Sequence, residues 1–99
     1  MTRRRAPAEL ADVLSQALRE AAPETALARV QVAWPSVVGP VIAAEASPSE
    51  ERDGAVLVDC ASAVWAQELE LLGPDLRERL NAALGTPLVR RLRFRVKAP

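Results

Sequence analysis

The sequence predicts an α+β domain in which helices pack on one face of a small three-stranded mixed sheet. Segments near residues 56 and 92 alternate apolar and polar side chains as strands do, whereas three other segments have the apolar spacing of helices. The longest helical segment connects the last two strands, which is typical of a parallel pair. The expected order is α-α-β-β-α(-α)-β. Because the chain has 99 residues, we expect a single domain, covering residues 7–97.

The beginning of the chain predicts a flexible basic arm followed by an amphipathic helix. Residues 1–6 contain three consecutive arginines and form the expected arm. Residues 7–21 place apolar side chains at positions i, i+3, i+4, i+7, i+8 and i+11, with charged residues between them. Pro7 suits the first position of this helix because its fixed backbone angle is already helical.

A second helix is expected to begin at Pro23, with Leu27, Val30 and Trp34 on its apolar edge. Pro35 is expected to bend or end this helix nearby. The following residues, as far as Gly39, predict a short helical turn. Trp34 is expected to anchor the helices against the sheet rather than to contact a ligand.

A hairpin is predicted in the middle of the chain, because Asp53-Gly54 is favoured in two-residue hairpin turns. The first strand is expected at roughly residues 44–52, where Pro48 indicates an edge strand or a late beginning. The second strand, residues 55–61, places one set of side chains on one face and another set on the opposite face. The first set is Val56, Val58 and Cys60, and the second is Leu57 and Asp59.

The segment 63–84 predicts the core helix of the domain. Its apolar residues form one stripe at helical spacing: Trp65, Leu69, Leu72, Leu76, Leu80, Ala83 and Leu84. Ser62 stands where an N-cap is expected and Gly85 where a helix commonly ends. Pro74 interrupts the segment and predicts a kink or a break into two helices.

The final strand predicts a row of cations on one face. Leu88, Leu92, Phe94 and Val96 alternate on one side, and the other side carries Val89, Arg91, Arg93, Arg95 and Lys97. Side chains on the same face of a strand are about 7 Å apart, a spacing that suits the phosphates of a nucleic-acid strand. Alternatively, these cations pair with acids of the core helix or of neighbouring strands.

The net charge of zero conceals a separation of charge along the chain. All thirteen acids lie between residues 6 and 85, whereas eight of the thirteen cations lie outside that range. This separation indicates an anionic partner for the two ends, or charges that pair within the molecule.

The composition excludes most catalytic chemistry. With no histidine and one cysteine, the chain has no histidine general base and none of the usual zinc sites. The four glycines are scattered and form no phosphate-binding loop. We therefore expect neither an enzyme nor a bound cofactor or metal. No long apolar run is present, so we expect a cytoplasmic protein without a membrane span or a secretory signal.

Three segments, in order, carry a resemblance to a known family. They are the corner from Trp34 to Val38-Gly39, the run Ser62-Ala63-Val64-Trp65-Ala66-Gln67-Glu68-Leu69, and Arg79-Leu80-Asn81-Ala82-Ala83-Leu84-Gly85 followed by Leu92-Arg93-Phe94. Together they resemble the DciA family of bacterial proteins, which are loaders or operators of the replicative helicase. The resemblance covers roughly residues 8–97.

The resemblance implies a domain similar to the type II KH fold, which binds the replicative helicase and single- or double-stranded DNA during DNA replication. The candidate nucleic-acid-binding residues are Arg3, Arg4, Arg5, Arg91, Arg93, Arg95 and Lys97. The candidate partner-binding residues are Trp65, Gln67 and Glu68, although the apolar stripe also suits Trp65 as a core residue. Which surface meets the helicase, and whether the chain forms a homo-oligomer, stay open.

The alternative function is a KH-like protein that binds ribosomal or other RNA. Two features of the sequence weigh against it. KH domains that clamp nucleic acid use a Gly-x-x-Gly loop, whereas the break Gly73-Pro74-Asp75-Leu76 has only one glycine and an acid. Aromatic residues that could stack on bases are also only 3% of the chain.

Overall fold

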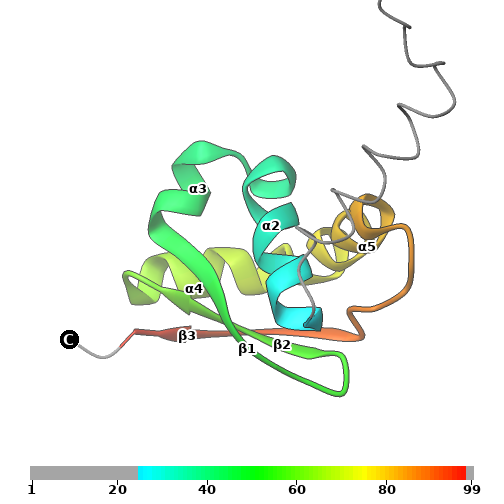
Figure 1. Cartoon of the computed structure of the whole chain (residues 1–99). Coiled ribbons are helices and arrows are strands. Elements are labelled where there is room, and N and C mark those ends of the chain that lie inside the picture. The colour runs from blue at the N-terminus through cyan, green and yellow to red at the C-terminus, as the bar shows by residue number, and fades with distance from the viewer. Residues whose placement is uncertain (1–24, 98–99) are drawn as a thin grey trace, which may run out of the picture.

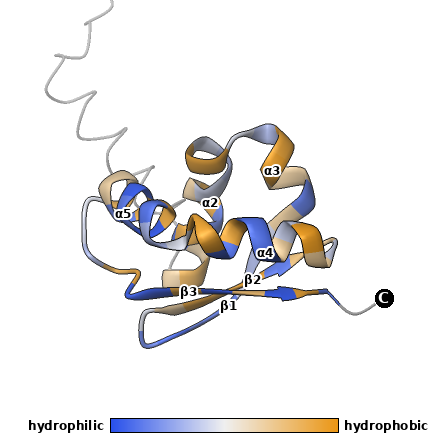
Figure 2. Cartoon of the chain, turned by 180° about the vertical axis from the view of Figure 1, so that it is seen from behind, coloured by the Kyte–Doolittle hydropathy of each residue, from blue (hydrophilic) through white to orange (hydrophobic). Residues whose placement is uncertain are grey.

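The computed structural model describes residues 25–97 and contains four helices and a three-stranded sheet in that range (Figure 1). The elements are α2 (Ala26–Val38), α3 (Pro40–Glu45), β1 (Ala46–Arg52), β2 (Ala55–Cys60), α4 (Ala63–Leu71), α5 (Gly73–Leu84) and β3 (Arg91–Val96). All four helices lie on one side of the sheet (Figures 1 and 2). The expected α+β class is confirmed, and the arrangement is consistent with a KH-like fold. The expected basic arm, the helix at 7–21 and Pro23 lie outside the described residues.

The sheet has the order β1-β2-β3 and mixes both kinds of pairing. β1 and β2 are antiparallel and joined at Asp53-Gly54, where φ is 50° and 88°. Positive φ at both central residues is what a tight hairpin turn requires, which is why this dipeptide predicted the hairpin correctly. β2 and β3 are parallel, as the intervening helical segment predicted. The register of β1 shifts between Pro48 and Glu50, a β-bulge.

The core lies between the sheet and the helices. It consists of Val30, Trp34, Val37, Ala46, Val56, Val58, Cys60, Leu69, Leu76, Leu80 and Val89. Trp34 is 2% exposed, and its indole N–H donates a hydrogen bond of 2.8 Å to the carbonyl oxygen of Ala46. This contact ties α2 to the start of β1, so the expected anchoring role of Trp34 is confirmed. The predicted division of the β2 side chains into two faces is also confirmed, and the face with Val56, Val58 and Cys60 is the buried one, at most 1% exposed.

The region around Pro35 differs from the prediction. Pro35 lies inside α2, which continues to Val38 and ends at Gly39, where φ is 89°. Proline removes one backbone donor but keeps a helical φ, and the buried Trp34 and Val37 hold the last turn against the core. The next six residues, Pro40–Glu45, form a separate helix, so β1 begins at Ala46 and not at residue 44.

The predicted core helix is two helices separated at Leu72. Ser62 caps α4 as expected, its hydroxyl accepting a hydrogen bond of 3.3 Å from the amide of Trp65. Pro74 occupies the first turn of α5, so the predicted break is confirmed. The continuous apolar stripe was wrong at two positions, because the change of direction leaves Leu72 at 47% exposed and Ala83 is also exposed.

Val89 was wrongly expected on the cationic face of the last strand. It is 1% exposed and belongs to the core, because the strand itself begins only at Arg91. The side-chain amide of Asn81 holds it there. Its Nδ2 donates to the Val89 carbonyl at 2.9 Å, and its Oδ1 accepts from the Val89 N–H at 2.8 Å. A side chain eight residues earlier thus shifts the alternation that the sequence suggested.

Candidate nucleic-acid interface

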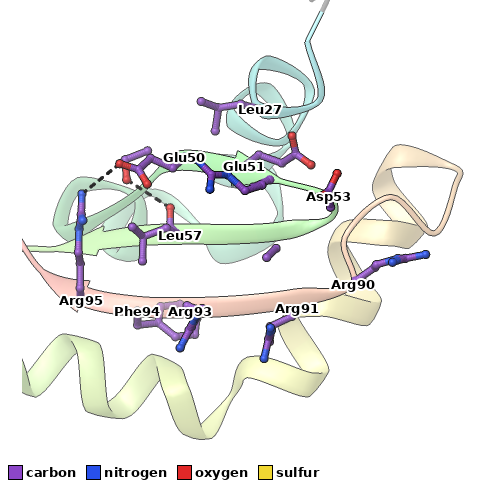
Figure 3. Close-up of a pocket in the computed structure, with 13 residues that line it drawn as sticks. Leu27, Glu50, Glu51, Asp53, Leu57, Arg90, Arg91, Arg93, Phe94 and Arg95 are labelled. Carbon is purple, nitrogen blue, oxygen red and sulfur yellow. Dashed lines mark hydrogen bonds and ion pairs between the residues drawn. The ribbon is translucent and has the colours of Figure 1, made fainter.

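Within residues 25–97, no helix covers one face of the sheet, and the cations of β3 lie on that face (Figures 1 and 2). In the parallel register, Arg91, Arg93 and Arg95 pair with Ala55, Leu57 and Asp59 of β2, the residues that alternate with the buried ones. Residues that pair in register share a face of the sheet. We call this side the open face. Its cationic side chains are exposed, and Figure 3 shows the face with the helices behind and beside it.

Arg95 is neutralised by acids from the other two strands. Its Nε lies 2.5 Å from Oδ1 of Asp59 on β2. Its terminal nitrogen lies 3.7 Å from Oε1 of Glu50 on β1, the pair drawn in Figure 3. The hydrogen bond from Arg95 lowers the pKa of the Asp59 carboxyl below its usual value and raises the pKa of the guanidinium. For this residue, the alternative that the cations pair within the sheet is therefore correct.

The other three predicted cations of this segment have no ion-pair partner among the described residues. Within residues 25–97, no acid lies within 4 Å of the charged groups of Arg91, Arg93 or Lys97. Lys97 stands just beyond the end of β3, whereas Arg91 and Arg93 stand near the β1–β2 turn. Arg3, Arg4 and Arg5 lie outside the described residues.

Two further arginines join this end of the open face. Arg52 of β1 pairs with Ala55, which pairs on its other side with Arg91, so Arg52 and Arg91 flank a small side chain. Arg90 packs on the turn itself: a Cβ atom added at Gly54 would lie 2.7 Å from its Cγ. The sequence prediction missed both, although the Asp-Gly turn fixes Arg52 opposite Ala55 and could have revealed that position.

These residues line a shallow hollow with two electrostatically different ends (Figure 3). The end near the turn has Arg52, Arg90, Arg91 and Arg93 around an apolar floor of Ala55 and Leu57. The far end contains the Arg95 ion pairs. Glu51 and Asp53 stand at the rim near the turn, but the Glu51 carboxylate accepts a hydrogen bond of 2.8 Å from the Gly54 amide. We call the four arginines and this floor the arginine cluster.

Among residues 25–97, the only aromatic side chain that borders the hollow is Phe94, and its ring turns away from the open face. The chain contains three aromatic residues. Trp34 is in the core, Trp65 is on α4, and the ring of Phe94 extends toward the start of α5, where its edge lies 3.8 Å from the Cβ position of Gly73. Because stacking on aromatic rings is how single-stranded bases are usually held, this face can contact phosphates more readily than bases.

The junction between α4 and α5 does not form a phosphate-binding loop. Gly73 is buried, and the residues before it, Leu71 and Leu72, are apolar and exposed by 75% and 47%. A loop that clamps phosphates needs backbone amides that a ligand can approach closely. This geometry agrees with the sequence argument against RNA clamping of the KH type.

The predicted partner-binding residues lie on α4, on the helical side of the molecule. Gln67 and Glu68 are exposed, whereas Trp65 is half-buried and packs against the core. Val64 and Leu71 are 70% and 75% exposed and lie on the same face as Gln67 and Glu68, one helical turn to either side. We call these four residues the α4 outer face. The sequence prediction missed its two apolar members.

Two absences hold for residues 25–97. No group of three or more histidine, cysteine, aspartate or glutamate side chains there could hold a metal ion. None of the helices at residues 25–97 has the length and apolar character needed to cross a bilayer.

Comparison with known proteins gives consistent matches. The model of the family described as "Dna[CI] antecedent, DciA" matches residues 9–94. A UPF0232 protein of Streptomyces avermitilis is 37% identical over 93 residues, which are 90% of this chain and 51% of that protein. A UPF0232 protein of Streptomyces coelicolor is 34% identical over 93 residues, covering 90% of this chain and 49% of that protein. A UPF0232 protein of Rhodococcus jostii is 38% identical over 61 residues, covering 62% of this chain and 32% of that protein. The chain spans about half the length of the Streptomyces relatives.

Proposed function

The chain belongs to the DciA family, associated with loading of the replicative helicase, and from this premise we propose that it is a non-enzymatic DNA-replication accessory protein that binds both the helicase and DNA. Its working unit is the single domain of residues 7–97, in the cytoplasm of a bacterium. The arginines of residues 1–6 add a second cationic segment to the DNA-binding surface.

The DNA site in this proposal is the arginine cluster. The observation that carries it is a helix-free sheet face on which Arg52, Arg91 and Arg93 are exposed without an ion pair in the described part of the chain. Arginine forks bind phosphate oxygens in two-pronged hydrogen bonds. Since the ring of Phe94 extends toward Gly73 of α5, the arginines are left to contact phosphates, and binding through phosphates alone has no base preference.

The helicase site in this proposal is the α4 outer face. It combines two exposed apolar side chains with Glu68, on a helix that carries two acids and no cation. Because this helix and the open face lie on opposite sides of the sheet (Figures 1 and 2), one domain can hold DNA and helicase at the same time. Trp65 supports this face from behind.

The DNA proposal is tested by fluorescence anisotropy of a labelled single strand across a salt series. Each phosphate contact on single-stranded DNA contributes about 0.7 to the slope of log affinity against log salt. Arg93→Ser removes one contact and lowers the slope by that amount. Arg77→Ser, which removes a charge from α5 on the helical side, leaves it unchanged. Equal effects of the two variants would mean that DNA binding depends on the net charge of the domain and not on the arginine cluster.

The helicase proposal is tested by pull-down and by adding the helicase to the same anisotropy series. Leu71→Ser on the α4 outer face is expected to abolish helicase binding without unfolding the domain, since Leu71 is 75% exposed. Val32→Ser, at a valine 69% exposed on α2, is the matched control. Tighter binding of RNA than of DNA, with no effect of helicase, would instead favour the RNA-binding alternative.

A further inference from the structure

β3 forms one edge of the sheet, and its outward backbone groups have no partner in the described structure. The amides of Arg91 and Lys97 donate to the carbonyls of Gly54 and Cys60, at 3.2 and 2.8 Å. In a parallel pair, alternate residues bond to the neighbouring strand, so the odd-numbered residues of β3 face β2. The N–H and C=O groups of Leu92, Phe94 and Val96 therefore point outward. No side chain or backbone group of residues 25–97 bonds to them outside the ladder.

The opposite edge of the sheet, β1, is protected against a further strand. Pro48 has no N–H, and the bulge after it breaks the regular spacing of the edge. α2 also covers its carbonyls: Trp34 donates to Ala46 at 2.8 Å, and Gln31 donates to Pro48 at 3.0 Å. The contrast between the two edges is a specific feature of this fold, since no side chain of residues 25–97 donates a hydrogen bond to the outer edge of β3, although α4 packs against that strand.

The side chains beside the β3 edge decide which strand can pair with it. Arg91, Arg93 and Lys97 stand on the open face without an ion pair among residues 25–97. Residues opposite each other on one face of a sheet lie about 5 Å apart, so a second copy of β3 would place cations against cations. A strand with acids at every second position would place carboxylates there instead. Its other positions would meet Val96, which is 48% exposed, and so favour apolar side chains.

We propose that the outer edge of β3 accepts an extended segment of another protein as a fourth strand, and that this segment alternates acidic and apolar residues. Main-chain hydrogen bonds from Leu92, Phe94 and Val96 supply the pairing, and Arg91, Arg93 and Lys97 supply the selectivity. The site is distinct from the α4 outer face. It shares Arg91 and Arg93 with the arginine cluster, so an acidic strand and DNA compete for these two side chains.

The probe is a capped eight-residue peptide that alternates glutamate and valine, added to the isotope-labelled chain and followed by amide NMR and hydrogen exchange. Binding is expected to slow exchange at Leu92, Phe94 and Val96. The same peptide with N-methyl groups on its β3-facing amides keeps its charge but loses half of the pairing, and is expected to bind at least tenfold more weakly. Equal binding by the methylated peptide would overturn the proposal in favour of simple charge attraction.

The second test changes the protein and not the peptide: Val96→Pro removes one of the outward N–H groups of β3. The Val96 N–H points outward, so proline removes no ladder bond, and proline is tolerated at such edge positions. Val96→Ala is the control that keeps the N–H. We expect Val96→Pro to lose peptide binding while retaining DNA binding, which separates this proposal from the DNA site. Peptide binding equal to that of Val96→Ala would refute strand addition. So would a concentration-dependent dimer of the chain that Val96→Pro abolishes, since it would assign the edge to a second copy.

Discussion

Removing Asp59, the nearer of the two acids that neutralise Arg95, is expected to strengthen DNA binding, because the remaining acid, Glu50, lies 3.7 Å from the guanidinium. In the native sheet, Asp59 holds the Arg95 guanidinium at 2.5 Å and keeps it from an incoming phosphate. Asp59→Asn preserves the size of the side chain and removes its charge. Arg95 then becomes available beside Arg93, one position further along the same face of β3. The sheet itself is unchanged, because Asp59 pairs with its neighbours through the backbone.

The magnitude follows from the release of counterions. One additional phosphate contact on a single strand steepens the salt dependence by about 0.7 in the slope of log affinity against log salt. Extrapolated from 1 M to 0.1 M salt, this slope corresponds to about a fivefold gain in affinity. The variant should thus bind about fivefold more tightly at 0.1 M salt and equally at high salt.

The assay is anisotropy of a labelled single strand at several salt concentrations. Glu78→Gln is the matched control, because it removes one exposed acid from α5 on the helical side and changes the net charge equally. If DNA binds to the open face, Asp59→Asn steepens the slope of log affinity against log salt and Glu78→Gln does not. If both variants gain equally, net charge explains the effect, and if neither changes the slope, DNA does not reach Arg95.

Three further predictions concern stability, each measured by denaturation. Trp34→Phe removes the indole donor to the Ala46 carbonyl and should cost about 1–3 kcal/mol, and Trp34→Ala about 3–5 kcal/mol or more; no loss in Trp34→Phe would mean that the hydrogen bond is irrelevant. Asn81→Ala leaves both backbone groups of the buried Val89 without their partner and should cost about 1–3 kcal/mol, and a neutral result would contradict the clamp. Because the hydrogen bond from Arg95 lowers the folded pKa of Asp59, its ion pair stabilises the fold above the unfolded pKa of about 4, and this contribution disappears as pH falls from there through the lowered folded pKa. The stability difference between the native chain and Asp59→Asn should therefore shrink over that range, and a constant difference would exclude the linkage.

The parts of the fold that follow from local chemistry were predictable. Asp53-Gly54 defines a hairpin because few other dipeptides adopt positive φ at both positions. The inward face of β2 follows from its period of two, and Ser62 marks the start of α4 because a hydroxyl can accept from a free amide of the first turn. Each of these signals depends on neighbours within a few residues.

The sequence predictions were wrong where residues distant in the sequence determine the local structure. Val89 leaves the expected alternation because Asn81, on another element, binds both of its backbone groups. Six residues are too few to show a helical period, so α3 was missed. The pairing of Arg95 depends on the register between β2 and β3, whereas alternation within one strand reveals only which face a side chain occupies.

The separation of charge along the sequence becomes a separation of faces in the fold. The described helices α4 and α5 carry Glu68, Glu70, Asp75 and Glu78 against two arginines, whereas the arginine cluster occupies the opposite side of the sheet. An anionic polymer is therefore repelled from the helical side and attracted to the open face, which orients the domain before contact. In the proposed function, this orientation leaves the α4 outer face pointing away from DNA. On that proposal, a single small domain without net charge holds two different partners in a defined geometry.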